Sequence, residues 1–238
     1  MSIASEITVP NQQSSLNQWL DYLLAIHPSE IDMGLTRVSA VARHLEVIDL
    51  APAKVITVAG TNGKGTTCAM LASILRQADL SVGVYSSPHL LHYNERVQIN
   101  QQDASDASLI EAFCAIEADR GDISLTFFEY ATLAGLYLFK AAKVDVIILE
   151  VGLGGRLDAT NMIDSTATIL TSIDLDHQEY LGDTRELVGR EKAGVFRPDC
   201  LAIVGEPDLP MSVTEYAHQI GTTLYRVGYE FDYHKDQS

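Results

Sequence analysis

Short apolar runs alternate with longer segments of helical periodicity over most of the chain. The spacing of apolar residues indicates helices within 14–27 and 38–45. The period then changes at 55–59, where the run VITVA is apolar and β-branched, as expected of a strand buried on both faces. The two N-terminal helices therefore precede a part of the chain with a different organisation.

Similar patterns continue along the rest of the chain. Further strands are expected at 82–85, 146–149, 167–171, 201–204, 223–227 and 230–233, and further helices at about 66–78, 104–119, 127–140 and 184–196. Strands that alternate with helices of this length predict an α/β fold, with a mostly parallel sheet flanked by helices. No repeat or linker marks an internal boundary, so we expect one domain over 1–238, with helices over about 1–50 and the α/β core over 51–238.

A glycine-rich turn joins the strand at 55–59 to the helix expected from Thr66. Glycines let backbone N–H groups approach phosphate oxygens, and the positive end of the helix dipole favours the same anion. Lys64 would neutralise phosphate charge, and the Thr66 hydroxyl could face Mg²⁺. The turn departs from the usual phosphate loop at Val58 and Gly65, and a plain strand-to-helix turn is the alternative. The residues expected to bind ATP are Gly60, Thr61, Asn62, Gly63, Lys64, Gly65 and Thr66.

Polar residues follow several of the expected strands. Glu150 ends an apolar strand, His177 follows the strand at 167–171, and Ser87 comes directly after the strand at 82–85. Because ligands gather at the carboxyl ends of parallel strands, these side chains are candidates for a magnesium site beside the glycine-rich turn. The alternatives are a surface acid at Glu150 and a structural hydrogen bond at His177.

Composition narrows the function further. The chain has 238 residues, of which 47% are hydrophobic, so it can bury a core. Its 16 basic and 32 acidic residues give a net charge of −16, which argues against nucleic acid or an anionic membrane as the main partner. Three scattered cysteines form no disulfide framework, no basic residue precedes Arg37, and no long apolar run occurs, so we expect a cytoplasmic protein.

Taken together, the segments resemble the folylpolyglutamate synthase/dihydrofolate synthase family of the Mur-ligase superfamily. The motifs that carry the resemblance are IDMGLTRV at 31–38, the loop at 60–67, SSPHL at 86–90, NERV at 94–97, TFFEY at 126–130, GLGGRLDATN at 152–161, LDHQ at 175–178 and EKAG at 191–194. The resemblance implies a P-loop ATPase domain of an ATP-dependent ligase that adds L-glutamate to 7,8-dihydropteroate and to folate polyglutamates through an acyl phosphate. A different Mur-type ligase that acts on a UDP-muramyl peptide, or a non-catalytic MgATP-binding fragment, are the alternatives.

The resemblance also implies roles for single residues. The metal ligands would be Ser87, Glu150 and His177, around Mg²⁺ ions that are expected to be two in number. Lys64, His177 and a carbamylated Lys192 would be catalytic. The dihydropteroate site would comprise Thr126, Phe127, Phe128, Glu129, Leu157, Asp158 and Ala159.

Three of these assignments have alternatives from the residues themselves. Phe127 and Phe128 suit the stacking of a flat ring, but one of the two is expected to pack in the core. Asp158 could accept hydrogen bonds from the pterin or instead cap the turn before Asn161. Lys192 could instead be a solvated charge on its helix, and its carbamylation needs a neutral amine, which burial would favour.

The chain departs from the resembled family in length. Such ligases carry a second, C-terminal domain that supplies much of the glutamate site, and this sequence stops at Ser238. We therefore expect a fragment that is inactive alone. Its partners are expected to be small molecules (ATP, L-glutamate and a folate precursor), and its state a monomer.

Overall fold

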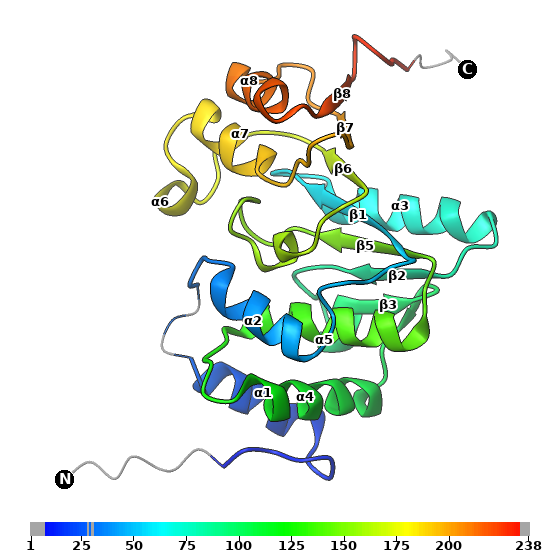
Figure 1. Ribbon diagram of the computed structural model, residues 1–238, viewed down its shortest axis with the longest axis vertical. Helices are drawn as coiled ribbons and strands as arrows, with labels where there is room; N and C mark the ends of the chain where they lie inside the picture. The colour runs from blue at the N-terminus through cyan, green and yellow to red at the C-terminus, as the bar shows by residue number, and fades with distance from the viewer. Residues whose placement is uncertain (1–7, 28, 30, 234–238) are drawn as a thin grey trace.

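The computed structural model describes residues 8–27, 29 and 31–233, and its centre is a single eight-stranded sheet (Figure 1). The strand order is β4-β3-β2-β5-β1-β6-β7-β8. From β2 to β8 all neighbours are parallel, whereas β2, β3 and β4 pair antiparallel. The strands are β1 Lys54–Ala59, β2 Val82–Tyr85, β3 Val97–Ile99, β4 Gln102–Asp103, β5 Val146–Glu150, β6 Ala167–Leu170, β7 Leu201–Val204 and β8 Thr223–Arg226.

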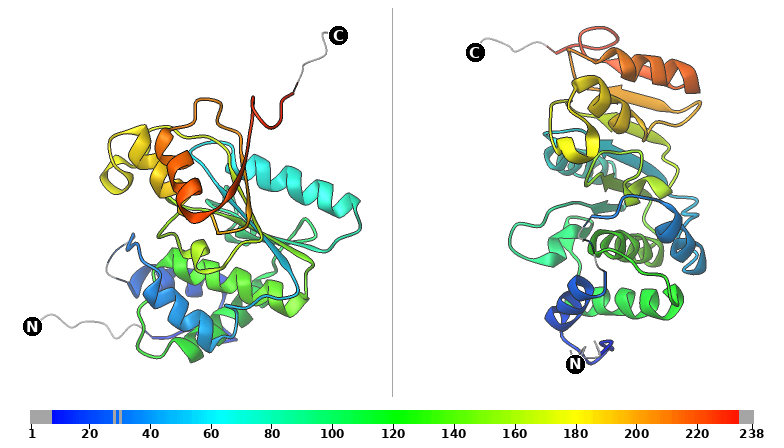
Figure 2. Two further views of the ribbon diagram at one scale, coloured as in Figure 1. Left: turned by 45° about the horizontal axis from the view of Figure 1, so that its top comes forward. Right: turned by 90° about the vertical axis from the view of Figure 1, so that its left-hand side faces the viewer.

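Helices cover both faces of this sheet, as the alternating pattern predicts (Figure 2). They are α1 Leu16–Ala25, α2 Thr36–His44, α3 Lys64–Gln77, α4 Asp106–Arg120, α5 Phe127–Ala142, α6 Gln178–Leu181, α7 Arg185–Ala193 and α8 Met211–Ile220, with the 3₁₀ helices η1 Tyr93–Arg96 and η2 Ala159–Met162. One face packs on α3 through Val58, Val84 and Ile148. Successive strand residues point to opposite faces, so Leu149 faces α5 and Leu170 faces α7 and α8 on the other side.

The N-terminal helices α1 and α2 pack on α4 and α5 rather than on the sheet itself. Trp19 of α1 is fully buried, with its ring 5.7 Å from that of Phe113. Nearby, the Glu117 carboxylate accepts hydrogen bonds from the Tyr22 and Tyr130 hydroxyls at 2.9 and 2.8 Å. Burial alone would raise the pKa of Glu117, but these bonds and the paired Arg120 guanidinium outweigh it and lower the pKa. The buried charge is thus fully paired, and it joins three helices.

The expected elements are confirmed with some corrections. The helix after the glycine-rich turn begins at Lys64 rather than Thr66, and residues 230–233 form no strand beyond one isolated bridge at Phe231. The antiparallel pair β3–β4 was not predicted, because its strands have only three and two residues. Its turn residues Asn100 and Gln101 adopt φ of 55° and 65° without the glycine that usually signals such a turn.

Helix α8 was also missed from the sequence. Only Val213 and Ala217 are buried in it, so its apolar stripe is too narrow for a clear helical period. Within the described residues, no helix has both the length and the apolar character needed to cross a membrane.

Packing of the sheet against α5 predicts a specific cost at Gly83. A Cβ added there would lie 2.5 Å from the buried Phe139 ring, whereas a Cβ at Gly34 would have no atom within 4 Å. We expect Gly83→Ala to lower the free energy of unfolding by about 1–3 kcal/mol, because overpacking displaces the ring. Urea unfolding measures it, with Gly34→Ala as the control expected to change little. Equal stability of the two variants would contradict this packing.

Candidate active site

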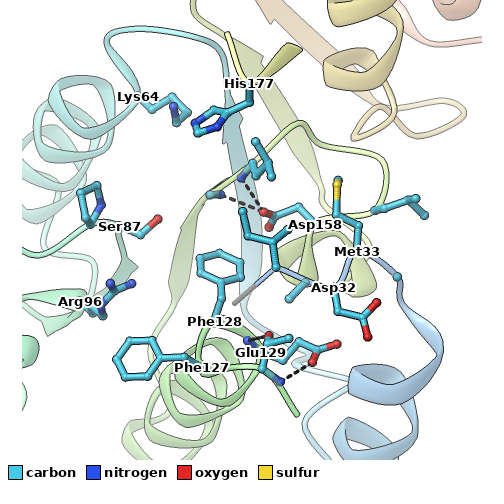
Figure 3. Close-up of a pocket in the computed structure, with 18 of the residues that line it drawn as sticks. Asp32, Met33, Lys64, Ser87, Arg96, Phe127, Phe128, Glu129, Asp158 and His177 are labelled. Atoms are coloured by element: carbon cyan, nitrogen blue, oxygen red, sulfur yellow. Dashed lines mark hydrogen bonds between the residues drawn. The ribbon is translucent and has the colours of Figure 1, made fainter. Parts of the chain in front are cut away.

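A cavity of about 700 Å³ opens at the carboxyl ends of the parallel strands (Figure 3). This edge is where open α/β sheets bind their ligands, and the volume suits a small molecule. Its lining combines the end of the glycine-rich turn with residues from the segments that follow β2, β5 and β6 and precede α2 and α5. Each of the motifs singled out from the sequence, except the one at 191–194, therefore contributes at least one residue to this cavity.

The glycine-rich turn is fixed by close contact with the end of β6. Gly60 has φ of 147°, and a Cβ added to it would lie 1.9 Å from the Thr171 hydroxyl oxygen. The Thr61 N–H donates to the Ser172 carbonyl at 2.8 Å, and the Asn62 N–H to the Ser172 hydroxyl at 3.0 Å. Glycine is therefore required at Gly60 for steric reasons, and the turn is held in one shape.

The turn leaves the start of α3 open to an anion. Gly63 precedes the helix with φ of 83° and offers no side-chain cap, so no side chain satisfies the first-turn N–H groups at 64–66. These N–H groups and the helix dipole together suit a phosphate. The Lys64 ammonium donates to the Gly60 and Thr61 carbonyls at 3.0 and 3.3 Å, so it lies over the turn. Thr66 is exposed on the same turn of helix.

Glu150 and Ser87 lie together next to this turn. The buried Glu150 carboxylate accepts a hydrogen bond from the Ser87 N–H at 3.3 Å, and a Cβ at Gly65 would be 3.6 Å from it. Burial raises the pKa of Glu150, and the Ser87 N–H and the charge of Lys64 act in the opposite direction. A buried carboxylate with few donors beside a hydroxyl is a donor set that fits Mg²⁺.

His177, the third expected ligand, lies apart from that pair. Its side chain is half exposed and points toward Lys64 (Figure 3), with Nε2 3.7 Å from Asp176. Within the part of the chain that the structure describes, no three side chains of His, Cys, Asp or Glu gather closely enough to hold a metal. The protein thus brings Ser87 and Glu150 together, while ligation by His177 stays a prediction.

Among the described residues, Lys192 is the only lysine that is buried. It lies on α7 with 3% of its surface exposed, and burial first, then the charge of Lys64, lower its pKa to about 8. The loop after β5 is tied to the same helix, because the Arg156 N–H donates to the Glu191 carbonyl at 3.0 Å and the Arg156 guanidinium pairs with the Glu191 carboxylate. The neutral amine that carbamylation requires is therefore accessible near neutral pH.

Thr126 and Glu129 form a capping box at the start of α5. The Thr126 N–H donates to the Glu129 carboxylate at 2.7 Å, and the Glu129 N–H to the Thr126 hydroxyl at 3.1 Å. The Arg37 guanidinium bridges the other Glu129 oxygen at 3.1 Å and Asp32 at 2.7 Å. Thr126 and Glu129 both line the cavity. The Glu129 carboxylate already has hydrogen-bond partners within the protein, so its contact with a substrate stays a prediction.

Phe127 and Phe128 both line the cavity and are both half-buried. The Phe128 ring packs 5.8 Å from Tyr85 and against Gly152, where an added Cβ would lie 2.6 Å away. Phe127 lies 5.6 Å from Tyr93. Both rings therefore pack against the core and also line the cavity, and the stacking of a substrate ring on either one stays a prediction.

Asp158 caps the turn that it precedes, which was the alternative to a contact with the pterin. Its carboxylate accepts from the N–H groups of Gly152 and Leu153 at 3.0 and 2.9 Å and from the N–H and hydroxyl of Thr160 at 3.0 and 2.6 Å. Burial raises the pKa of Asp158 against the effect of these bonds. Asp158 lines the cavity beside Leu157 and Ala159, and a contact from it to a pterin stays a prediction.

Several lining residues were not predicted as site residues. The main ones are Ile31–Gly34, Arg96 and His89. The segment 31–34 reaches the cavity because Arg37 forms ion pairs with both Asp32 and Glu129 of α5. The Arg96 Nε donates to His89 Nδ1 at 2.9 Å, and burial and the charge of Arg96 lower the pKa of His89. Their membership in the quoted motifs was the only available signal, because no periodicity shows which of these side chains point inward.

Comparison with known proteins identifies the family of this chain. The profile of the Mur ligase middle domain matches residues 58–204. The dihydrofolate synthase/folylpolyglutamate synthase of Escherichia coli K12 is 54% identical over 224 residues, covering 94% of this chain and 53% of that protein. The structure of E. coli FolC in complex with DHPP and ADP has a TM-score of 0.94 at 53% identity, covering 96% of this chain and 55% of that one.

A second solved structure extends the comparison to a metal. A bifunctional folylpolyglutamate synthase/dihydrofolate synthase with Mn, AMPPNP and L-glutamate bound has a TM-score of 0.90 at 54% identity, covering 96% of this chain and 55% of that one. The present chain spans about half the length of the curated relatives it matches.

The hydrogen bonds around Asp158 predict a stability effect. Asp158→Asn replaces one carboxylate oxygen by a donor that faces N–H groups, so we expect the free energy of unfolding to fall by about 1–3 kcal/mol. Urea unfolding at neutral pH measures it. The matched control is Asp164→Asn, where the carboxylate is 89% exposed and pairs with Arg197, and a loss below about 1 kcal/mol is expected. A loss no larger than the control's would show that the cap carries little stability.

Proposed function

The chain belongs to the Mur ligase family, and because its relatives are dihydrofolate synthase/folylpolyglutamate synthases we propose that it is the ATP-binding part of such a ligase. The proposed reaction adds L-glutamate to 7,8-dihydropteroate and to folate polyglutamates, and converts ATP to ADP and phosphate. The observation that carries the proposal is a single cavity that joins a phosphate-binding turn at one end to an aromatic wall at the other.

The chemistry proceeds in two transfers. An oxygen of the substrate carboxylate attacks the γ-phosphorus of ATP, and the bond between that phosphorus and the β,γ-bridging oxygen breaks. ADP departs, and the substrate is now an acyl phosphate. The amine of L-glutamate then attacks the acyl carbon, phosphate departs with its bonding electrons, and the nitrogen loses a proton to give the amide. Activation is needed because a free carboxylate is a poor electrophile.

The chain's own residues serve the first transfer. The free N–H groups at 64–66 would bind phosphate oxygens, and Lys64 would exchange its contacts with the Gly60 and Thr61 carbonyls for the phosphates. Mg²⁺, held by Ser87, Glu150 and His177, would offset the charge that builds up between the two anions. One such ion fits the Ser87–Glu150 pair, and a second ion is part of the proposal.

The aromatic wall would hold the acid substrate. Phe127 and Phe128 offer ring surface, and Leu157 and Ala159 line the cavity near them. Thr126, Glu129 and Asp158 shape this wall through their hydrogen bonds. We infer that Lys192 becomes carbamylated, which turns a buried cation into an anion that can approach the metal site.

Other expectations accompany this proposal. A division at about residue 50, a monomeric state and a cytoplasmic location stay predictions. The alternatives, a ligase for UDP-muramyl peptides and a non-catalytic MgATP-binding fragment, differ from the proposal in what the aromatic wall binds, so a binding experiment separates them.

Calorimetry with 7,8-dihydropteroate tests the proposal directly. With Mg²⁺ and a non-hydrolysable ATP analogue present, we expect the chain to bind dihydropteroate more tightly than without them. Lys64→Ala should weaken binding of the analogue at least about tenfold, because a charge-assisted contact is lost. The control is Lys54→Ala, an exposed lysine at the opposite end of β1, which should leave it unchanged. Nucleotide binding with no affinity for dihydropteroate would favour the alternatives.

The lowered pKa of Lys192 predicts the pH dependence of its carbamylation. With the pKa at about 8, roughly one-tenth of the amine is neutral at pH 7 and roughly nine-tenths at pH 9. Carbamate formation needs the neutral amine, so its signal in ¹³C NMR under ¹³C-labelled bicarbonate should rise across this range. Lys192→Gln should lack the signal. A wild-type chain without it at pH 9 would remove Lys192 from the proposed mechanism.

A further inference from the structure

Arg96 has an unusual environment for a charged side chain. It is only 8% exposed and lies at the end of η1, yet it lines the cavity. Its guanidinium carbon is 5.6 Å from the centre of the Tyr93 ring and 5.5 Å from that of the Phe127 ring. Figure 3 shows it on the same wall as Ser87, next to the two phenylalanines.

This buried cation has no anionic partner in the described part of the chain. Arg96 forms no ion pair there. The arginines that do form ion pairs all have more exposed side chains, and they are Arg37, Arg120, Arg156, Arg185, Arg197 and Arg226. Acidic residues outnumber basic ones two to one in this protein, so an unpaired, nearly buried arginine is not explained by a shortage of carboxylates. Burial of a charge without a partner is costly unless a ligand supplies one.

The contacts of Arg96 fix which of its donors are used. Its Nε donates to His89 Nδ1 at 2.9 Å, and a hydrogen bond from the guanidinium to the Tyr85 hydroxyl acts to lower the pKa of that hydroxyl. Since arginine only donates, the bond also shows that His89 Nδ1 is the unprotonated nitrogen of its ring. A guanidinium has five N–H donors, and His89 and Tyr85 use two of them, so about three donors on the terminal NH₂ groups remain to bind a carboxylate in a fork.

We propose that Arg96, held in place by His89 and Phe127, is the residue that binds the carboxylate of the acid substrate. This inference rests on the proposed function and names the subsite within it. The phosphate groups of ATP have their own donors at the start of α3, whereas the aromatic wall has no other cation within it. A flat aryl carboxylate that lies on Phe127 and Phe128 would present its charged end to the guanidinium, on the Ser87 side of the cavity.

The test compares a charged ligand with its uncharged counterpart. Binding of 7,8-dihydropteroate and of its primary carboxamide is measured by calorimetry without nucleotide and with EDTA, so that no metal contributes. We expect the wild-type chain to prefer the carboxylate by about ten- to a hundredfold, as a charge-assisted hydrogen bond would give. In Arg96→Met the preference should fall to within about threefold, and Arg96→Lys should keep part of it.

Controls separate this role from a structural one. Arg226→Met removes another arginine that lies over an aromatic ring, at 4.4 Å from Tyr229 and outside the cavity, and should keep the full preference. Binding of the ATP analogue, measured separately, reports whether each variant is folded. If Arg96→Met does not fold, Arg96→Lys decides, because a fork replaced by a single ammonium should still reduce the preference.

Three outcomes would overturn the inference. An unchanged preference in folded Arg96 variants would place the carboxylate elsewhere and leave the proposed function intact. An equal loss of affinity for both ligands would make Arg96 a structural residue of the aromatic wall. A wild-type chain that binds neither ligand here, and that also fails to bind dihydropteroate with Mg²⁺ and the ATP analogue present, would contradict the proposed function together with this subsite.

Discussion

The contact between the ends of β1 and β6 determines the geometry of the glycine-rich turn and of the start of α3. Gly60 passes so close to Thr171 that no side chain fits between them, and the two residues that follow donate their N–H groups to Ser172. The turn therefore cannot move away from the end of β6, and this fixes where α3 starts, at Lys64. Without this contact the first-turn N–H groups and Lys64 would have no fixed direction.

The strand order then places the rest of the site. β5 lies beside β1 on the side away from β6, so Glu150 ends next to the start of α3, and β2 brings Ser87 to the same point from one strand further. The loop after β5 bends over the cavity for two reasons. The Asp158 carboxylate accepts hydrogen bonds from the N–H groups of Gly152 and Leu153, and Arg156 pairs with Glu191 of α7. The glycine-rich turn, Glu150 and Ser87 thus follow three adjacent strands, β1, β5 and β2.

Much of this arrangement could be predicted from the sequence. Buried parallel strands such as Val146–Glu150 are apolar throughout, and the residues that follow them must lie at one edge. The segment 31–34 and Arg96 could not be placed, because their positions depend on ion pairs and ring contacts between elements far apart in the chain. For the same reason Glu129 and Asp158 were assigned to a ligand, although much of their hydrogen-bonding capacity is used within the protein.

The bridge from Arg37 to Asp32 and Glu129 has a consequence for the dynamics of the molecule. One wall of the cavity is attached through a half-exposed guanidinium to helices packed in the N-terminal cluster, whereas the nucleotide turn is anchored in the middle of the sheet. Regions with different anchoring open with different free energies. Loss of this bridge would therefore reshape the wall of the cavity formed by 31–34 while the glycine-rich turn, held by Thr171 and Ser172, keeps its geometry.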